Sequence, residues 1–434
     1  MYENSEPNPL LQTLSAEPQE TISLARHVIL PFDLRISHAA AFSEKENGIL
    51  LASIFPGCTG TATDGYFMYY FLKELPPKPW PKTIAGLPPH FSESPEQLNG
   101  PMPRARLVGW RGGSIAEDRN YRDVEDWDPL FDLINDHFQS LAISMTEVIY
   151  WGNQVTIVLE YRDTDLSKLP WKVAKVHCVY LYDDEMGRPS TPQARRLRDP
   201  VPGSPDESRY DDTLQPGVMV TSGYFPDQPT TFLSTTAGVM VEDEFGEQFV
   251  TVANRGFPTE CGTDVMHPLP TDGRTIGNLV KEVPQTDIAL VKLLGGERFL
   301  NVTFQNEINA EPIQLKSLAQ SCRTGDLILL DSPYTGCIEG SVLASARQRI
   351  PADNDSLPEQ LWVRTVWSYM GQDEGSALPD ELCGSAIHNE EGQVVAFFRY
   401  APQVGSMVNW CAGISARELI DQGFTLVDQT SRAS

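Results

Sequence analysis

Hydrophobic residues recur every three or four positions between residues 127 and 140, at Trp127, Leu130, Phe131, Leu133, Ile134 and Phe138. This spacing predicts an amphipathic helix. Next, MTEVIYW (145–151) and QVTIVLEY (154–161) flank Gly152-Asn153, a turn signal typical of a β-hairpin. A further strand is expected at 173–182. Residues 21–186 are therefore predicted to form an α+β domain with an antiparallel sheet.

The composition changes after residue 186. Residues 187–217 are rich in Pro, Arg, Asp and Ser without periodicity, which is typical of a linker. From 218 to 428, short β-rich segments follow one another with turn residues between them, such as AGVMVED, TDIALVKL, DLILLDS and LWVRTVW. This pattern predicts an all-β sandwich or barrel, ending in a helix near 415–422. Polar tails are expected at 1–20 and 429–434.

Charge and cysteine content narrow the classes of partner. Asp and Glu outnumber Lys and Arg 59 to 33, giving a formal net charge of −26 among 434 residues. Such a surface repels phosphate backbones and anionic lipid, so neither nucleic acid nor membranes are expected partners, and the charge is explained by solubility. The seven cysteines are dispersed, without metal-ligand spacing, and no signal peptide or transmembrane segment is evident. We expect a cytoplasmic protein with reduced thiols and no metal or other cofactor.

Several segments of the C-terminal half resemble those of trypsin-like peptidases, the PA clan with the chymotrypsin fold. FVTVAN (249–254) resembles the strand that carries the histidine, and TDIALVKL (286–293) resembles the segment that supplies the aspartate. ELCGSAI (381–387) resembles the nucleophile turn, with a cysteine in place of serine. The chain also resembles a group of fungal proteins that carry a CGSA turn. The resemblance implies a chymotrypsin-like double β-barrel following the α+β domain.

The resemblance also implies roles for individual residues. Cys383 takes the nucleophile position and Asp287 that of the acid that orients the base. Leu382, Gly384 and Glu381 form the oxyanion region. Phe397, Phe398 and Arg399 belong to the strand alongside which a substrate lies.

Two departures from the family pattern argue against peptidase activity. The base position falls on Asn254 or, with a one-residue shift, on Arg255, and neither can accept a proton near neutral pH. Glu381 stands where the family has a glycine, so a Cβ and a negative charge disfavour the oxyanion site. Losing a member of a catalytic triad costs on the order of 10⁴ in rate.

Each candidate residue also has an alternative role. His267 could serve as a base from a first-barrel loop, or it could be a packing histidine before a proline. Cys383 could be a small buried hydrophobe, and Asp287 could cap local backbone N–H groups. Arg255 is expected to pair with Asp287, or alternatively to lower the pKa of the Cys383 thiol.

Three hypotheses about function follow. The first is a degenerate peptidase homologue that is catalytically weak or inactive and binds a peptide or protein. The second is an active cysteine endopeptidase with Cys383 as nucleophile, Asp287 as orienting acid and an unrecognised base such as His267. In the third, the α+β domain carries the function, although it shows no phosphate loop, metal cluster or nucleophile motif. The sequence does not indicate an oligomeric state.

Overall fold

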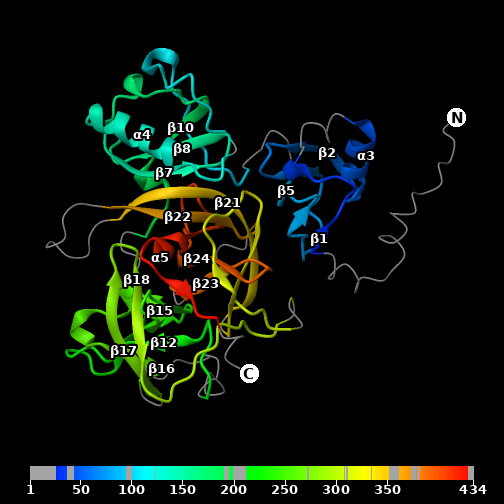
Figure 1. Cartoon of the computed structure of the whole chain (residues 1–434). Helices are drawn as coiled ribbons and strands as arrows, with labels where there is room; N and C mark the ends of the chain where they lie inside the picture. Colours follow the sequence, from blue (N-terminus) through cyan, green and yellow to red (C-terminus); the bar gives the residue numbers. More distant parts are fainter. Residues whose placement is uncertain are drawn as a thin grey trace. The chain divides into compact units, whose positions relative to one another are not determined.

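The computed structural model of this chain (Figure 1) is described over a set of ranges: 26–36, 44–93, 100–122, 124–189, 195–198, 212–270, 273–306, 308, 311–333, 335–350, 361–372, 378 and 382–428. The tails predicted at 1–20 and 429–434 lie outside the described residues, as does most of the linker predicted at 187–217. The chain divides into two compact units, residues 1–100 and 101–434.

The first unit holds two small sheets. β1 (His27–Val28) pairs in parallel with β4 (Thr83–Ile84). The second sheet has the order β2 (Cys58–Thr63), β3 (Met68–Leu72) and β5 (Pro89–Ser92). With α3 (Lys45–Ser53), these elements enclose a core of Leu34, Leu51, Met68, Tyr70, Leu72, Ile84, Ala85, Leu87 and Phe91.

A closed barrel of short strands occupies residues 219–293 of the second unit. Its strands are β12 (Met219–Thr221), β13 (Thr231–Thr236), β14 (Met240–Glu242), β15 (Gln248–Ala253), β16 (Asp264–His267), β17 (Arg274–Val283) and β18 (Ile288–Leu293). Three residues separate β13 from β14, so the two act as one bent strand. β13 pairs with β12, and β14 pairs with β15. The ring therefore runs β12, β13/β14, β15, β18, β17, β16 and back to β12.

A second closed barrel follows with the same strand order. Its strands are β20 (Leu327–Ser332), β21 (Gly336–Ile350), β22 (Leu361–Tyr369), β23 (Ala386–His388), β24 (Gln393–Tyr400) and β25 (Trp410–Ser415). The ring runs β20, β21, β22, β25, β24, β23 and back to β20. Two barrels of identical strand order confirm the chymotrypsin-like double barrel predicted for this half.

Shared hydrophobic packing joins the two barrels. One buried cluster combines Val239, Phe249 and Leu290 of the first barrel with Val363, Val394 and Phe397 of the second. The predicted C-terminal helix is present as α5 (Arg417–Asp421), and its Leu419 packs into this cluster. β26 (Thr425–Leu426) then returns to pair with β14 of the first barrel. Residues 417–426 therefore contact both barrels.

Minor strands border both barrels. β11 (Arg195–Arg198) pairs with β13, and β19 (Ser317–Leu318) pairs in parallel with β24.

Residues 101–186, expected to belong with residues 21–100, extend the sheet of the second barrel. Their elements are β6 (Ser114–Ile115), α4 (Asp128–Ser140), β7 (Met145–Tyr150), β8 (Gln154–Leu159), β9 (Lys172–Val173) and β10 (Val176–Tyr182). The predicted helix and hairpin are both confirmed. β7 pairs with β21, which continues the barrel sheet into this region. The expected antiparallel sheet is corrected to a mixed one: β10 runs parallel to β8, because the connection between them is long enough for a crossover.

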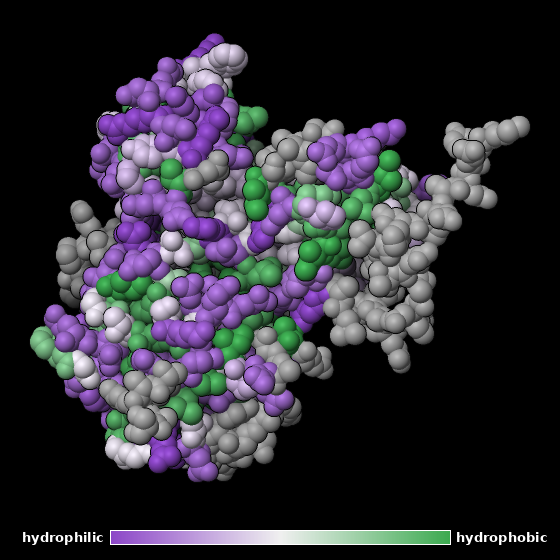
Figure 2. Space-filling model, turned by 45° about the vertical axis from the view of Figure 1, so that its right-hand side comes forward, coloured by the Kyte–Doolittle hydropathy of each residue, from purple (hydrophilic) through white to green (hydrophobic). Residues whose placement is uncertain are grey.

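Hydrophilic residues predominate on the face drawn in Figure 2, with smaller hydrophobic areas among them. Across the described ranges, the helices are too short or too polar for a bilayer crossing. Among the described residues, the seven cysteines form no disulfide.

Candidate functional site

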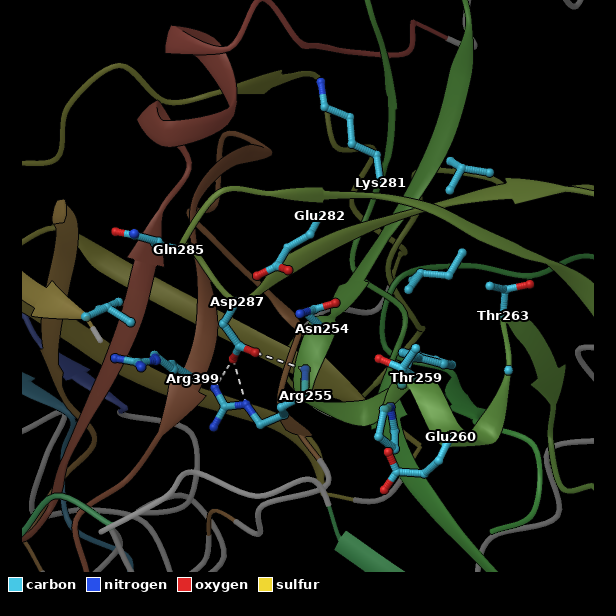
Figure 3. A pocket seen from close by; sticks show the side chains of 16 residues that line it. Asn254, Arg255, Thr259, Glu260, Thr263, Lys281, Glu282, Gln285, Asp287 and Arg399 are labelled. Carbon is cyan, nitrogen blue, oxygen red and sulfur yellow. Dashed lines mark hydrogen bonds and ion pairs between the residues drawn. The ribbon is translucent and has the colours of Figure 1, made fainter. Parts of the chain in front are cut away.

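A cleft of about 910 Å³ opens beside the end of β15 (Figure 3). Most of its wall comes from the first barrel: the 3₁₀ turns Asn254–Gly256 and Thr259–Cys261, the strand β17 and the turn into β18. The second barrel contributes Ile350 from β21 and Arg399 from β24. Its lining residues are Asn254, Arg255, Phe257, Pro258, Thr259, Glu260, Gly262, Thr263, Leu279, Val280, Lys281, Glu282, Gln285, Asp287, Ile350 and Arg399. Both barrels therefore border the cleft, as in the predicted fold.

Arg255 and Asp287 form an ion pair in this cleft. The Asp287 backbone takes a left-handed conformation (φ 58°), which aspartate tolerates better than most residues. The backbone N–H of Arg255 donates to Asp287 Oδ1 at 3.1 Å, and its Nε donates to Oδ2 at 2.6 Å. The Nη2 of Arg255 donates to the same Oδ2. The pairing expected from the sequence is present. The Nε and Nη2 groups of Arg255, the fork of its guanidinium, both donate to one oxygen of the carboxylate.

Asn254 joins the same cluster through its backbone, whose N–H donates to the main-chain oxygen of Asp287 at 2.9 Å. Both base-position candidates therefore contact Asp287. In a catalytic triad this carboxylate accepts the ring N–H of the histidine. Here the carboxylate of Asp287 instead accepts hydrogen bonds from the guanidinium of Arg255.

Cys383 lies beside the cleft and is not among the residues that line it. Its side chain is 1% exposed, and its Sγ donates to the carbonyl of Arg399 at 3.1 Å. It packs in the core of the second barrel with Leu382, Ile387 and Phe398. The thiol is therefore surrounded by protein instead of facing a substrate.

The turn around Cys383 is fastened to the first barrel. The Cys383 carbonyl accepts hydrogen bonds from the Thr236 N–H, at 3.0 Å, and from the Thr235 hydroxyl. Gly384 has φ +91°, and a Cβ there would lie 2.7 Å from Thr236 O and 2.8 Å from Ala253 N. Glycine is required for this close approach, which brings the turn against the end of β15, one residue before Asn254.

Two backbone N–H groups that follow Cys383 donate to carbonyls of the protein. Gly384 N donates to Phe398 O at 2.9 Å, and Ser385 N donates to Leu382 O at 2.9 Å. An oxyanion site needs such donors to converge on an open position next to the nucleophile. Leu382 is fully buried, and Glu381 lies outside the described residues. In this fold the oxyanion donors are the N–H groups of the nucleophile and of the residue two positions before it, here Cys383 and Glu381. The oxyanion role of this region therefore stays a prediction.

His267 lies in β16, where its ring is fully buried and its Nδ1 is 2.7 Å from the carbonyl of Met219. It does not line the cleft. His388 lies in β23, where burial lowers its ring pKa and Nδ1 contacts Asn389 O. The contact with Met219 places the ring of His267 against β12. A base role for His267 stays a prediction.

The three residues of the predicted substrate strand have different surroundings. Phe397 belongs to the core shared by the barrels, and Phe398 belongs to the core of the second barrel. Of the three residues, only Arg399 reaches the cleft. Sequence analysis missed Gln285, Glu282 and Lys281, because the end of β17 and the turn that follows it carry no motif beyond Asp287.

No family model and no curated protein matches the chain. Solved structures do resemble about half of it. A glutamic-acid-specific serine protease is 13% identical over 49% of this chain and 100% of its own, with a TM-score of 0.36. A Nocardiopsis protease is 14% identical over 50% and 100%, with a TM-score of 0.36. The Cellulomonas bogoriensis chymotrypsin is 12% identical over 50% and 98%, with a TM-score of 0.35. Similarity this low says nothing about activity or substrate; the strand order of the two barrels defines the fold.

Proposed function

We propose that this chain is a degenerate homologue of trypsin-like peptidases, which binds a peptide segment in the cleft between its barrels and does not cleave it. The observation that carries the proposal is the Arg255–Asp287 pair. Peptide hydrolysis in this fold needs a group that accepts a proton from the nucleophile. A guanidinium remains protonated at all relevant pH values, so Arg255 cannot accept one.

The environment of Cys383 supports the same proposal. A reactive cysteine is at least partly exposed and sits beside a group that favours its thiolate. Cys383 is 1% exposed and already donates its proton to the Arg399 carbonyl. That carbonyl carries a partial negative charge, which favours the neutral thiol.

The cleft itself supports peptide binding. A volume of about 910 Å³ lies within the range of ligand sites, about 300–1,000 Å³. Its wall combines apolar surface from Phe257, Pro258 and Leu279 with polar groups from Asn254 and Thr259. An extended peptide, with alternating side chains and main-chain N–H and C=O groups, matches such a mixed lining.

The test uses the full-length chain and a pool of randomised decapeptides. Binding is followed by fluorescence anisotropy of a rhodamine label, and cleavage by mass spectrometry of the same samples. The matched variants are Cys383→Ala and Cys411→Ala, since both remove a buried thiol from the second barrel. We expect saturable binding and no cleavage in wild type and in both variants.

Two results would overturn the proposal. The first is turnover by wild type that C383A abolishes and C411A keeps, because that would establish the cysteine-endopeptidase alternative. The second is the absence of binding by any member of the pool.

A further inference from the structure

We infer that Arg399 recognises a carboxylate of the bound peptide, either an acidic side chain or the C-terminus. This inference rests on the proposed function, since it concerns the ligand of the same cleft. It follows from the placement of Arg399 in β24, from the contacts of its guanidinium and from the balance of charge along the wall.

A β-bulge directs Arg399 toward the cleft. The pairing of β24 with β25 shifts register between Phe398 and Tyr400, so Arg399 is the extra residue on its strand. A bulge of this kind changes the direction of a side chain relative to the regular alternation of the strand. The Arg399 carbonyl accepts the Cys383 thiol, while its side chain lines the cleft (Figure 3).

The guanidinium of Arg399 is buried against the neutral side chains of Gln348 and Tyr400. The side chain is 8% exposed, and its Nη1 donates to the neutral Gln348 Oε1 at 2.8 Å. In the described part of the chain, its Nε has no hydrogen-bond partner and no carboxylate lies within ion-pair distance. The one carboxylate nearby that affects it, Asp287, is already held by the fork of Arg255.

A second arginine in the same unit has its charge neutralised by carboxylates. The Arg188 side chain is also largely buried, with 13% exposed, and it pairs with Glu147 and Asp183. Burying a guanidinium without a counter-charge is costly. Arg399 retains that cost in the free protein, and a bound anion would relieve it. Burial accordingly lowers the pKa of Arg399, which remains protonated.

The cleft wall has no net formal charge, which disfavours a multiply charged anion. Arg255, Lys281 and Arg399 are balanced by Glu260, Glu282 and Asp287. A monoanionic carboxylate fits one uncompensated guanidinium, whereas a phosphate dianion would meet the three carboxylates. A carboxylate also matches the planar fork of arginine by two parallel hydrogen bonds.

The experiment compares three labelled decapeptide pools that contain no other acidic residues. The first has a central Glu and an amidated C-terminus, the second a central Gln and an amidated C-terminus, and the third a central Gln and a free C-terminus. Each is titrated into the full-length chain and into Arg399→Met, Arg399→Lys and Arg323→Met. Arg323 is the control because it is exposed and pairs with Glu125 away from the cleft.

We expect one carboxylate-bearing pool to bind about 10- to 100-fold more tightly than the neutral pool, the range of a charge-assisted hydrogen bond. R399M abolishes this preference, R399K keeps part of it, and R323M keeps all of it. Which pool is preferred identifies the source of the carboxylate. Thermal unfolding of R399M at or above the wild-type temperature would confirm that the residue is not retained for stability.

Equal binding of the three pools would overturn this inference and leave the proposed function standing. A preference that survives in R399M would also overturn it. If no pool binds, the inference and the proposed function fail together.

Discussion

The ion pair between Arg255 and Asp287 gives a prediction about the free energy of unfolding, because the loss of one partner should cost more than the loss of the other. Both side chains are nearly buried, 10% and 13% exposed. Asp287→Asn removes the negative charge and keeps a side chain that tolerates the left-handed backbone at this position. Arg255→Met removes the positive charge and keeps the length of the side chain.

Losing Asp287 should cost more than losing Arg255. Without Asp287, both Arg255 and Arg399 are left in one cleft wall, and the carboxylate that stabilises the charge of Arg399 is gone. Without Arg255, Asp287 keeps the Arg255 backbone N–H and the nearby charge of Arg399. Breaking a buried pair costs about 3–5 kcal/mol. We therefore expect D287N to lower the free energy of unfolding by about 4 kcal/mol and R255M by about 2 kcal/mol.

The assay is urea unfolding of the two single variants and the double variant, followed by tryptophan fluorescence and circular dichroism. The double variant lacks both charges, so its loss should fall short of the sum of the single losses by about 2 kcal/mol. Additive losses within about 0.5 kcal/mol would refute the interaction. A D287N protein at least as stable as R255M would refute the expected stabilisation of the Arg399 charge by Asp287.

Further substitutions test the protein that surrounds the cleft. Burial raises the pKa of Asp331 to about 6, so the folded chain binds this proton more tightly than the unfolded chain. Its contribution to stability is therefore lost as pH rises from about 4 to about 6, by about 3 kcal/mol, and D331N should remove this loss in urea titrations at pH 4.5 and 7. Gly384→Ala should destabilise by about 3 kcal/mol or more in thermal unfolding, against about 1 kcal/mol for Gly423→Ala, whose φ is also positive but whose Cβ meets open space. Arg188→Met leaves Glu147 fully buried without its cation and should cost about 3–5 kcal/mol by the same assay. Equal effects at the two glycines, or a pH dependence that D331N retains, would contradict these assignments.

Local patterns were sufficient to predict most elements of the second unit. The hairpin around Gly152-Asn153 and the helix at 128–140 follow from hydrophobic period and turn residues, which act within a few positions. The Arg255–Asp287 pair could also be anticipated, because the two residues occupy matched positions of a known fold and carry opposite charges.

Features that depend on distant pairing could not be predicted. The register of β7 against β21 joins residues almost two hundred positions apart, and no local signal sets it. The bulge at Arg399 arises from the pairing of β24 with β25, so the strand pattern alone did not separate this residue from Phe397 and Phe398. The burial of Cys383 depends on a turn fastened to β13, which lies in the other barrel.

The most direct test of a silent nucleophile position is the alkylation rate of Cys383 against pH, measured by mass spectrometry. Cys178 and Cys411 are equally buried, and burial raises the pKa of each to about 12. Cys58, Cys261 and Cys337 are half-buried and serve as accessible references. We predict that at pH 6 Cys383 reacts as slowly as Cys178 and Cys411. Labelling of Cys383 at pH 6 faster than that of the half-buried cysteines would reveal an accessible thiolate and contradict the account of a cleft that binds without cutting.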